Sequence, residues 1–319
     1  MKNRYSNIFP YSQKILNKTI KLLAKGNTVS LPTETVYGLA GNAYSKAAVE
    51  KIFRQKGRPK LNPLIIHYYN IQKTLDDVVV NDNFKKLYKK LCPGPITFIL
   101  KKKKNSRIQP LASAKLKTVA VRFPKHKVAR SILNNINFPL AMPSANLSSN
   151  VSPVCAKDVF DEFNKKIKLI VDGGKSKFGI ESTVIDLTDK PKILRPGIIG
   201  SAKIKKILKL VIKNNINNLK IKSPGMLKKH YSPGIPVFIN QTKFNNKHAI
   251  IYLGKKFKNK KNYFSLSKNC NLNEAASNLY TTLRLIKKRG FKKIQIAKIP
   301  LIGSGIAIND RIKRAANKR

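Results

Sequence analysis

Short apolar runs alternate with helix-like patterns along the chain. Runs of consecutive apolar residues predict buried strands, and apolar residues that recur every three or four positions predict amphipathic helices. The predicted strands are 28–31, 64–66, 96–100, 118–124, 139–142, 169–171, a segment within 179–186, 193–194, 237–239, 249–252 and 293–299. The predicted helices are 15–24, 45–55, 127–134, 156–163, 204–212, 273–288, one within 76–91 and one from about 308. This alternation indicates an α/β fold.

The stretch 31–67 organises the rest of the chain. Two predicted strands, 29–31 and 64–66, enclose a hydroxyl-rich turn at 32–35 and a cationic loop that holds Lys56 and Arg58. Taken alone, the turn sequence PTET is more typical of a helix cap than of a site. Because the turn and the cationic loop both stand at strand ends, they predict a pocket for a phosphorylated or carboxylated ligand. Glu34, within the turn, could orient a base or help to hold a metal ion.

Further polar turns follow other predicted strands. They are Pro143–Ser148, Asp172–Gly174, 179–183 and Arg195–Gly197, and Arg122 ends one more strand. Each is an ordinary loop when taken alone, but hydroxyls, amides and backbone N–H groups at strand ends suit phosphate or ribose contacts. Four cations, Lys56, Arg58, Arg122 and Arg195, stand at these ends. We therefore predict that they line a single basic cleft.

The length of 319 residues allows two domains, and the formal net charge is +52. Twelve of the 14 carboxylates precede residue 200 and 29 of the 66 basic residues follow it, which gives about +25 before and +27 after. Such a charge favours polyanions. The plainer explanation is AT-rich coding, because lysine, asparagine and isoleucine crowd every surface segment. If any segment contacts RNA, including double-stranded RNA, we expect the C-terminal third of the chain to do so.

The three cysteines, Cys92, Cys155 and Cys270, lie far apart and form no CxxC pair. A zinc site or a disulfide framework is therefore not expected, and a reducing compartment fits this spacing. No apolar run is long enough for a membrane span, and the N-terminus lacks a signal-peptide core. We expect a soluble cytoplasmic protein that makes no membrane contact.

A second, smaller α/β unit follows a segment rich in proline and glycine at 223–234. Its segment Gly303–Ile308 contains two glycines but lacks the third glycine of a dinucleotide fingerprint. Helix capping and close packing explain this segment better than nucleotide binding does.

Taken together, the motifs resemble the Sua5/YrdC/YwlC family of threonylcarbamoyl-AMP synthases. The motifs are, in order, LPTETVYGL, KGRPKLNPL, PGPITFIL, VAVRFPKH, PSANLSSNVSP, DGGKSKFGIESTVID, LRPG and SPGMLKKHYSP. The last of these and the closing GSGIAINDRIKRAA resemble the two-domain Sua5 form. The resemblance implies a twisted mixed β-sheet YrdC-like domain with a concave basic cleft, plus a small Rossmann-like α/β domain. We place the catalytic domain at 12–200, the linker at 201–234 and the Sua5 domain at 235–319.

The resemblance also implies an activity and its site residues. The family is a nucleotidyltransferase that joins L-threonine, bicarbonate and ATP into threonylcarbamoyl-AMP and releases pyrophosphate. Partner proteins, a threonylcarbamoyl-transferase complex, then modify adenosine 37 of ANN-decoding tRNAs. The positions that match threonine contacts are Thr35, His67, Arg122, Met142 and Ser182. The positions that match ATP contacts are Lys56, Arg58, Asn62, Thr118, Ser144, Ser152, Arg195 and Tyr231.

No Ser-His-Asp group or nucleophilic cysteine is expected, so catalysis would rest on positioning and on charge neutralisation by Lys56 and Arg58. Mg²⁺ is expected with ATP, although no carboxylate cluster indicates its ligands. The departures from the family pattern are Ser149, Val154 and Ala40, together with a short C-terminal domain whose regulatory role is open.

Two alternatives remain open from the sequence. A non-enzymatic RNA-binding protein would explain the charge but not the polar turns at the strand ends. A hydrogenase-maturation carbamoyltransferase shares the first domain, but it carries zinc-finger cysteines and an acylphosphatase-like segment that this chain does not show.

Overall fold

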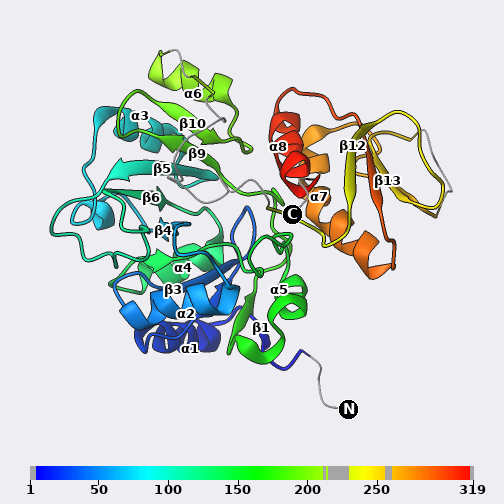
Figure 1. Cartoon of the computed structure of the whole chain (residues 1–319). Helices are drawn as coiled ribbons and strands as arrows, with labels where there is room; N and C mark the ends of the chain where they lie inside the picture. Colours follow the sequence, from blue (N-terminus) through cyan, green and yellow to red (C-terminus); the bar gives the residue numbers. More distant parts are fainter. Residues whose placement is uncertain (1–4, 211–212, 215–229, 256–260, 317–319) are drawn as a thin grey trace.

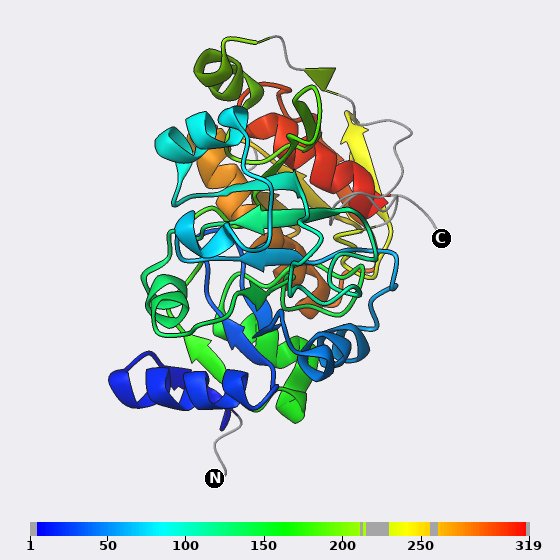
Figure 2. The same cartoon turned by 90° about the vertical axis from the view of Figure 1, so that its left-hand side faces the viewer.

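The structure, a computed structural model, describes residues 5–210, 213–214, 230–255 and 261–316. It contains two α/β units, which lie side by side in Figure 1. The larger unit is built on a mixed sheet of eleven strands and the smaller on a sheet of four. Figure 2 shows the larger unit from another side, with α1 and α6 at its opposite ends. The predicted α/β fold, with a large mixed sheet and a smaller second unit, is confirmed.

Within the described residues, the larger unit holds eleven strands and six α-helices. In chain order the strands are β1 (Ile8–Pro10), β2 (Val29–Leu31), β3 (Gly38–Asn42), β4 (Ile65–His67), β5 (Ile96–Lys101), β6 (Thr118–Arg122), β7 (Leu140–Ala141), β8 (Ile170–Asp172), β9 (Thr183–Asp186), β10 (Lys192–Arg195) and β11 (Lys213–Asn214). The helices are α1 (Gln13–Ala24), α2 (Lys46–Lys56), α3 (Asp82–Leu91), α4 (Lys127–Asn134), α5 (Ala156–Phe163) and α6 (Ser201–Leu208), with short 3₁₀ turns at Gln72–Thr74 and Asn164–Lys166.

The order of strands in the large sheet is β1-β8-β2-β3-β7-β4-β6-β5-β9-β10-β11. The two strands that enclose the organising stretch, β2 and β4, are therefore not neighbours, since β3 and β7 lie between them. β4 and β6 run parallel with His67 opposite Arg122, and β7 runs antiparallel to β4. This register places the ends of strands from distant parts of the sequence at one place on the sheet.

Helix α2 shows how local sequence aims the cationic loop. Its N-cap Ser45 accepts a hydrogen bond from the N–H of Ala48, and its buried face packs Val49, Ile52 and Phe53 into the core. The helix ends at Gly57, whose φ of +58° lies in the left-handed region that glycine adopts without strain. The chain therefore leaves the helix sharply at this point.

The smaller unit is a parallel sheet of order β12-β15-β13-β14 with two helices. Its elements are β12 (Val237–Gln241), β13 (Ala249–Tyr252), β14 (Tyr263–Ser265), α7 (Leu272–Lys288), β15 (Ile294–Ala297) and α8 (Ser304–Ala316). Gly305 lies in the first turn of α8, where a Cβ would stand 2.0 Å from the Pro300 carbonyl oxygen. Close packing thus accounts for this glycine, as predicted.

Several predicted boundaries were wrong. The final helix begins at Ser304 rather than near 308, and α6 spans Ser201–Leu208 rather than 204–212. Strands β1, β3, β11 and β14 were not predicted. Of the predicted linker, residues 211–212 and 215–229, including the SPGM sequence at 223–226, lie outside the described residues.

The hydrophobic core of the smaller unit continues into the larger one. Val36, Val151, Val154 and Ile180 of the larger unit belong to the same buried cluster as the inner faces of α7 and α8. Both units thus bury apolar surface against each other, and the seam between them passes beside the segments that carry Thr35 and Ser152. No helix among the described residues combines the length and the apolar character needed to cross a membrane.

Candidate active site

The ends of the central strands surround a small cavity. It is about 40 Å³ in volume and is lined by Thr33, Val36, Gly38, Arg58, Ile65, His67, Arg122, Met142, Pro143, Ser144, Glu181, Arg195, His230 and Tyr231. The lining comes from the turn after β2, the loop after α2, the ends of β4, β6 and β10, the turn after β7, and residues 230–231. The predicted cleft is thus present, and three of its four predicted cations line it.

Arg122 is held by a buried carboxylate. Its Nη2 donates to Glu34 Oε1 at 2.8 Å, and Glu34 Oε2 accepts from the backbone N–H of Lys125 at 3.0 Å. Burial alone would raise the pKa of Glu34, but the Arg122 charge and these hydrogen bonds hold the pKa below its usual range. The structure gives Glu34 a different role from the base-orienting or metal-holding one considered above: its carboxylate orients Arg122. The described residues contain no cluster of three metal-ligating side chains.

One guanidinium nitrogen of Arg122 is left for a ligand. Its Nε is buried and has no hydrogen-bond partner among the described residues. A buried donor without a partner costs free energy, so such a group in a cavity is suited to an acceptor that arrives with a ligand. A carboxylate is the acceptor that matches a guanidinium best.

The other residues around Arg122 add uncharged surface to the cavity wall. Burial, followed by the Arg122 charge, lowers the pKa of His67 well below its ordinary value, so its ring stays neutral. Gly38 lets Met142 approach, since a Cβ at Gly38 would lie 2.3 Å from Met142 Cγ. The hydroxyl groups of Thr33 and Thr35 share a 2.9 Å hydrogen bond beneath the cavity.

Two further arginines, Arg58 and Arg195, also line the cavity. Arg58 donates from Nε to the Asn62 carbonyl at 2.9 Å and from Nη2 to Asn62 Oδ1 at 2.7 Å. Arg195 donates to the carbonyl and to the hydroxyl of Ser182, both at 3.1 Å. Burial and the nearby Arg195 charge lower the pKa of Arg58, which means that the two cations repel each other at close range. An anion placed beside them would relieve that repulsion.

Lys56 has a different place from the one predicted. Its ammonium donates to the carbonyl of Ser144 at 2.5 Å and to that of Asn146, and it does not line the cavity. Burial, then the Arg58 charge, lowers its pKa well below the usual range. In this structure Lys56 holds the turn that contains Ser144 through these two hydrogen bonds. Its ammonium adds positive charge close to the cavity without lining it.

The structure brings together nearly all of the thirteen predicted site residues. Seven line the cavity: His67, Arg122, Met142, Arg58, Ser144, Arg195 and Tyr231. Five more bond to a lining residue: Thr35 to Thr33, Ser182 to Arg195, Asn62 to Arg58, Ser152 to Glu181 and Lys56 to Ser144. Thr118 is the exception, because it lies at the opposite end of β6 from Arg122, paired with Lys101.

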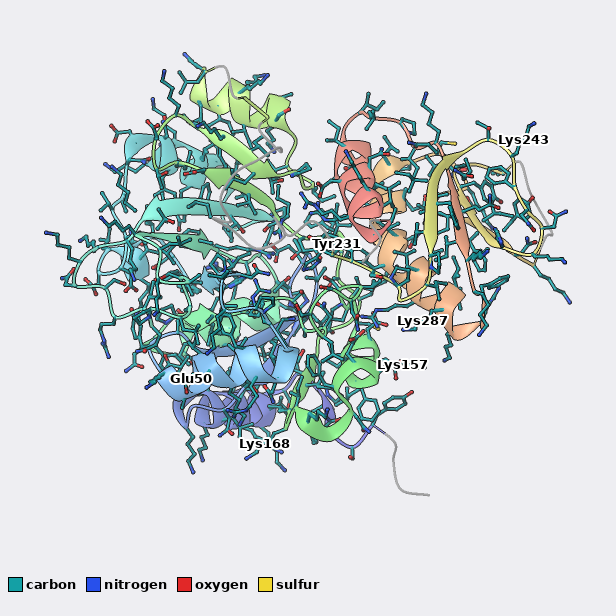
Figure 3. All side chains as sticks on the ribbon, viewed as in Figure 1. Glu50, Lys157, Lys168, Tyr231, Lys243 and Lys287 are labelled. Atoms are coloured by element: carbon teal, nitrogen blue, oxygen red, sulfur yellow. The ribbon has the colours of Figure 1, made fainter. Side chains whose placement is uncertain are left out.

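Sequence reasoning did not place His230 or Glu181 in the site. Tyr231 and His230 fill the cavity from the linker side, with ring centroids 4.1 Å apart. Figure 3 labels Tyr231 between the two units. Tyr231 is fully buried at a φ of +62°, and its hydroxyl has no hydrogen-bond partner among the described residues. The resemblance had placed Tyr231 among the ATP contacts, and the structure adds His230 beside it in the cavity lining.

The burial of His230 predicts a pH dependence of stability. Burial lowers the pKa of His230 from 6.5 to about 3, with Arg58, Lys56 and Arg195 contributing and Glu181 opposing. A lowered pKa means that the neutral form is favoured in the fold, so this stability is complete above pH 6.5. It is lost toward pH 3 at about 1.4 kcal/mol per pH unit.

We expect His230→Asn to flatten the fall of the melting temperature between pH 6.5 and 5. His67 and His126, whose pKa values burial also lowers, contribute equally to both proteins. Thermal melts of wild type and variant across this range measure the difference. Identical slopes would show that His230 does not occupy the cavity in solution.

Two family models together cover almost the whole chain. One, described as "Telomere recombination", matches residues 21–197, and the other, described as "Threonylcarbamoyl-AMP synthase, C-terminal domain", matches residues 199–317. The first match lies within the larger unit, and the second includes the whole smaller unit together with α6 and β11 of the larger one.

Comparisons with individual proteins point to the same family as these two matches. The threonylcarbamoyl-AMP synthase of Pyrococcus abyssi is 34% identical over 93% of this chain and 92% of its own length, and that of Bacillus subtilis is 35% identical over the same shares. The crystal structure of P. abyssi Sua5 complexed with L-threonine superimposes with a TM-score of 0.88, at 31% identity and 97% coverage of each chain. The chain belongs to the Sua5/YrdC/YwlC family, in its two-domain Sua5 form.

Proposed function

We propose that this protein is a threonylcarbamoyl-AMP synthase, a nucleotidyltransferase that uses L-threonine, bicarbonate and ATP. In the proposed reaction the threonine amine takes up CO2 derived from bicarbonate and forms a carbamate. A carbamate oxygen then bonds to the α-phosphorus of ATP, and pyrophosphate leaves with the electrons of the broken P–O bond. The products are threonylcarbamoyl-AMP, pyrophosphate and water.

The main support is that two separate sets of cationic and polar side chains line one cavity. Arg122 offers a buried, unpartnered Nε, and Asn62 beside Arg58 offers a buried Nδ2 that likewise lacks a partner among the described residues. Arg122 suits the threonine carboxylate, while Arg58, Asn62 and Arg195 suit a polyphosphate. Two anions held from opposite sides would meet between these groups, where the new bond must form.

The chain's own contribution is positioning and charge. Fixed guanidinium groups compensate the negative charge that gathers on carbamate and phosphate, and their burial strengthens the interaction. Neutral His67 adds no positive charge beside the threonine amine, which must be uncharged to take up CO2.

We further propose that Mg²⁺ arrives with ATP and is held mainly by the phosphate oxygens. The two carboxylates closest to the cavity are unsuited as ligands, because Glu34 is paired with Arg122 and Glu181 with Arg311. When bound, the ion would neutralise phosphate charge together with the arginines.

The cavity must open before both substrates can bind. Its volume of about 40 Å³ is close to that of a single water molecule, whereas pockets for ligands of this size hold at least about 300 Å³. His230 and Tyr231 line this space, so we infer that His230 moves outward when ATP binds, while Tyr231 stays against the smaller unit and contacts the nucleotide.

The reaction itself tests the proposal. We expect purified protein with ATP, Mg²⁺ and labelled bicarbonate to release pyrophosphate only when L-threonine is added, with the label recovered in an AMP conjugate. L-serine and D-threonine serve as controls for the threonine half. Pyrophosphate release that does not depend on threonine, or none at all, would overturn the assignment.

The later fate of the product belongs to the same proposal. We infer that a threonylcarbamoyl-transferase complex passes the group to adenosine 37 of ANN-decoding tRNAs, in the cytoplasm. The second family match, over residues 199–317, favours this assignment over a hydrogenase-maturation protein. The net charge of +52 is compatible with contact between the protein and tRNA.

A further inference from the structure

Glu181 lies where the two units meet the cavity. Its side chain is buried, and each carboxylate oxygen is already engaged. Oε1 accepts from the Ser152 hydroxyl at 2.6 Å, and Oε2 accepts from Arg311 Nε at 2.9 Å. The Tyr280 hydroxyl contacts both oxygens, at 3.2 and 2.9 Å. Tyr280 belongs to α7 and Arg311 to α8, so two groups of the smaller unit hold a carboxylate of the larger one.

This arrangement fixes the direction of the Ser152 hydroxyl. Burial would raise the pKa of Glu181, but the charges of Arg311 and Arg195 and the hydrogen bonds lower it to about 2. An ionised carboxylate can only accept, so Ser152 must donate its proton to Glu181. The Ser152 oxygen is then left as an acceptor. It suits the hydroxyl or amino groups of a nucleoside and not the oxygens of a phosphate.

The same two residues also hold Tyr231. The Arg311 guanidinium carbon lies 5.1 Å from the centroid of the Tyr231 ring, and the Tyr280 ring stacks on it at 5.8 Å. Both contacts are of the kind that fixes an aromatic ring in place. Tyr280 and Arg311 therefore act on two residues of the proposed nucleotide site. They contact the Tyr231 ring directly, and they reach Ser152 through Glu181.

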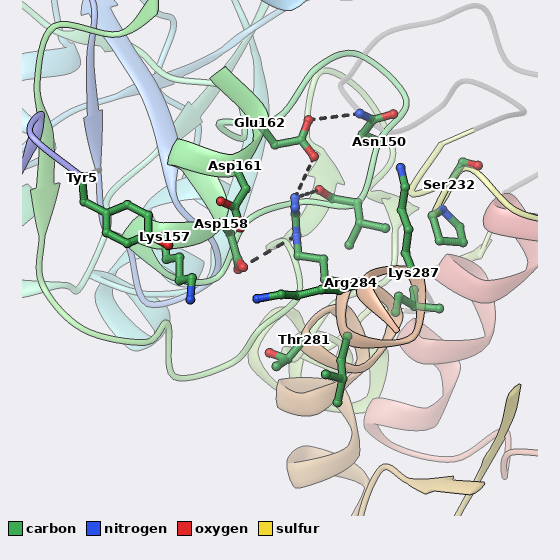
Figure 4. A pocket seen from close by; sticks show the side chains of 15 residues that line it. Tyr5, Asn150, Lys157, Asp158, Asp161, Glu162, Ser232, Thr281, Arg284 and Lys287 are labelled. Carbon is green, nitrogen blue, oxygen red and sulfur yellow. Dashed lines mark hydrogen bonds and ion pairs between the residues drawn. The ribbon is translucent and has the colours of Figure 1, made fainter. Parts of the chain in front are cut away.

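A second anchor fixes the chain on the other side of Ser152. Arg284 of α7 donates from Nη2 to the carbonyl of Val151 and to Glu162 Oε1, the latter at 3.1 Å. Figure 4 shows Arg284 reaching from α7 across to Glu162 and Asp158 of α5. This groove, about 640 Å³ in volume, lies on the outer side of the seam. The segment that carries Ser152 is thus held by the smaller unit at two adjacent points.

We propose that Tyr280 and Arg311 are positioning residues for the nucleoside half of the active site. Through Glu181 they orient the Ser152 hydroxyl as an acceptor, and through ring contacts they set the place of Tyr231. The inference rests on the proposed function, because it takes Ser152 and Tyr231 as nucleotide contacts. It gives the smaller unit an indirect part in ATP recognition, through residues of the site that it positions.

The variant Tyr280→Phe tests this role with little change in packing, since it removes one hydroxyl and keeps the stacked ring. We expect the KM for ATP to rise about 5- to 10-fold, while the KM for threonine stays within about twofold. Calorimetry should show AMP binding weakened by the same factor, whereas inhibition by pyrophosphate, which has no nucleoside, stays unchanged. Tyr263→Phe is the matched control, because its hydroxyl contacts Asn246, another residue of the smaller unit, and is not among the groups that contact Glu181.

A double-mutant cycle then separates positioning from a general effect on the fold. If Tyr280 acts through Ser152, Tyr280→Phe should cost little AMP affinity in a Ser152→Ala background. Multiplicative losses in the double variant would overturn the proposal. Equal losses of threonine and AMP affinity would also overturn it, and so would an unchanged AMP affinity in Tyr280→Phe.

The outcomes distinguish this inference from the proposed function. If wild-type protein releases no threonine-dependent pyrophosphate, the synthase assignment fails, whatever the AMP titrations show. If wild type is active but Tyr280→Phe binds AMP normally, only the positioning role fails. Arg311→Met is a second variant, expected to weaken AMP binding more strongly, and its melting temperature reports whether it still folds.

Discussion

Arg122→Ala is expected to raise the threonine concentration for half-maximal pyrophosphate release about 100-fold, because the charge-assisted hydrogen bond from Arg122 Nε to the carboxylate and the charge of Arg122 are lost. The requirement for ATP should change less than about threefold, since the proposed phosphate contacts are Arg58, Asn62 and Arg195 and not Arg122. Initial rates measured against each substrate in turn check both values. A larger effect on ATP than on threonine would contradict the assignment of Arg122.

Stability must be measured beside activity for this variant. Removing Arg122 leaves Glu34 buried without its cation, which costs about 3 kcal/mol or more. Glu34→Gln is the matched variant, because it keeps Arg122 and removes only the charge that orients it. We expect Glu34→Gln to raise the threonine requirement less than Arg122→Ala does. Thermal melts of all three proteins separate loss of binding from loss of fold.

Arg58→Ala is expected to give the opposite pattern, with the ATP requirement raised about 100-fold and the threonine requirement little changed. Two effects add in this variant. The phosphates lose a cation, and the loop at 58–63 loses the hydrogen bonds from Arg58 to the Asn62 and Pro63 carbonyls. Steady-state kinetics against ATP at saturating threonine measure the change.

Two further variants sharpen this result. Arg54→Ala removes the same charge one turn earlier on α2, where the side chain is exposed, and should leave both requirements unchanged. Arg58→Lys keeps the charge without the planar fork and should recover only part of the loss. If Arg54→Ala and Arg58→Ala behaved alike, net charge would explain the effect rather than a phosphate contact.

Much of the fold follows from local sequence patterns. Helices α4 and α5 have the predicted bounds, because their apolar spacing is regular and a capping group precedes each: the His126 side chain for α4, and Cys155 with Asp158 for α5. Strand β3 was missed because its sequence, GLAGN, lacks the branched and aromatic residues that mark strands. It forms only because β2 and β7 supply hydrogen-bonding partners on both sides.

The site was predictable as a set of residues but not as a set of contacts. Strand ends and cationic loops indicate where side chains gather, and they identified Arg58, Arg122 and Arg195. They give no information about pairing over long sequence distances, such as Glu34 with Arg122 or Glu181 with Arg311. The far position of Thr118 shows the same limit, since alternation fixes the face of a strand but not which end meets the ligand.

The contact surface between the two units restricts the exchange of either unit for that of a relative. Gly179 lies at the seam with a φ of +67°, and a Cβ there would stand 2.5 Å from the Ser277 carbonyl oxygen, so the contact is backbone against backbone. A chimera that joined residues 1–200 to the C-terminal unit of a relative would need this fit as well as partners for Glu181. Recombination between family members is therefore constrained at the contact surface more than at the linker that joins the two units.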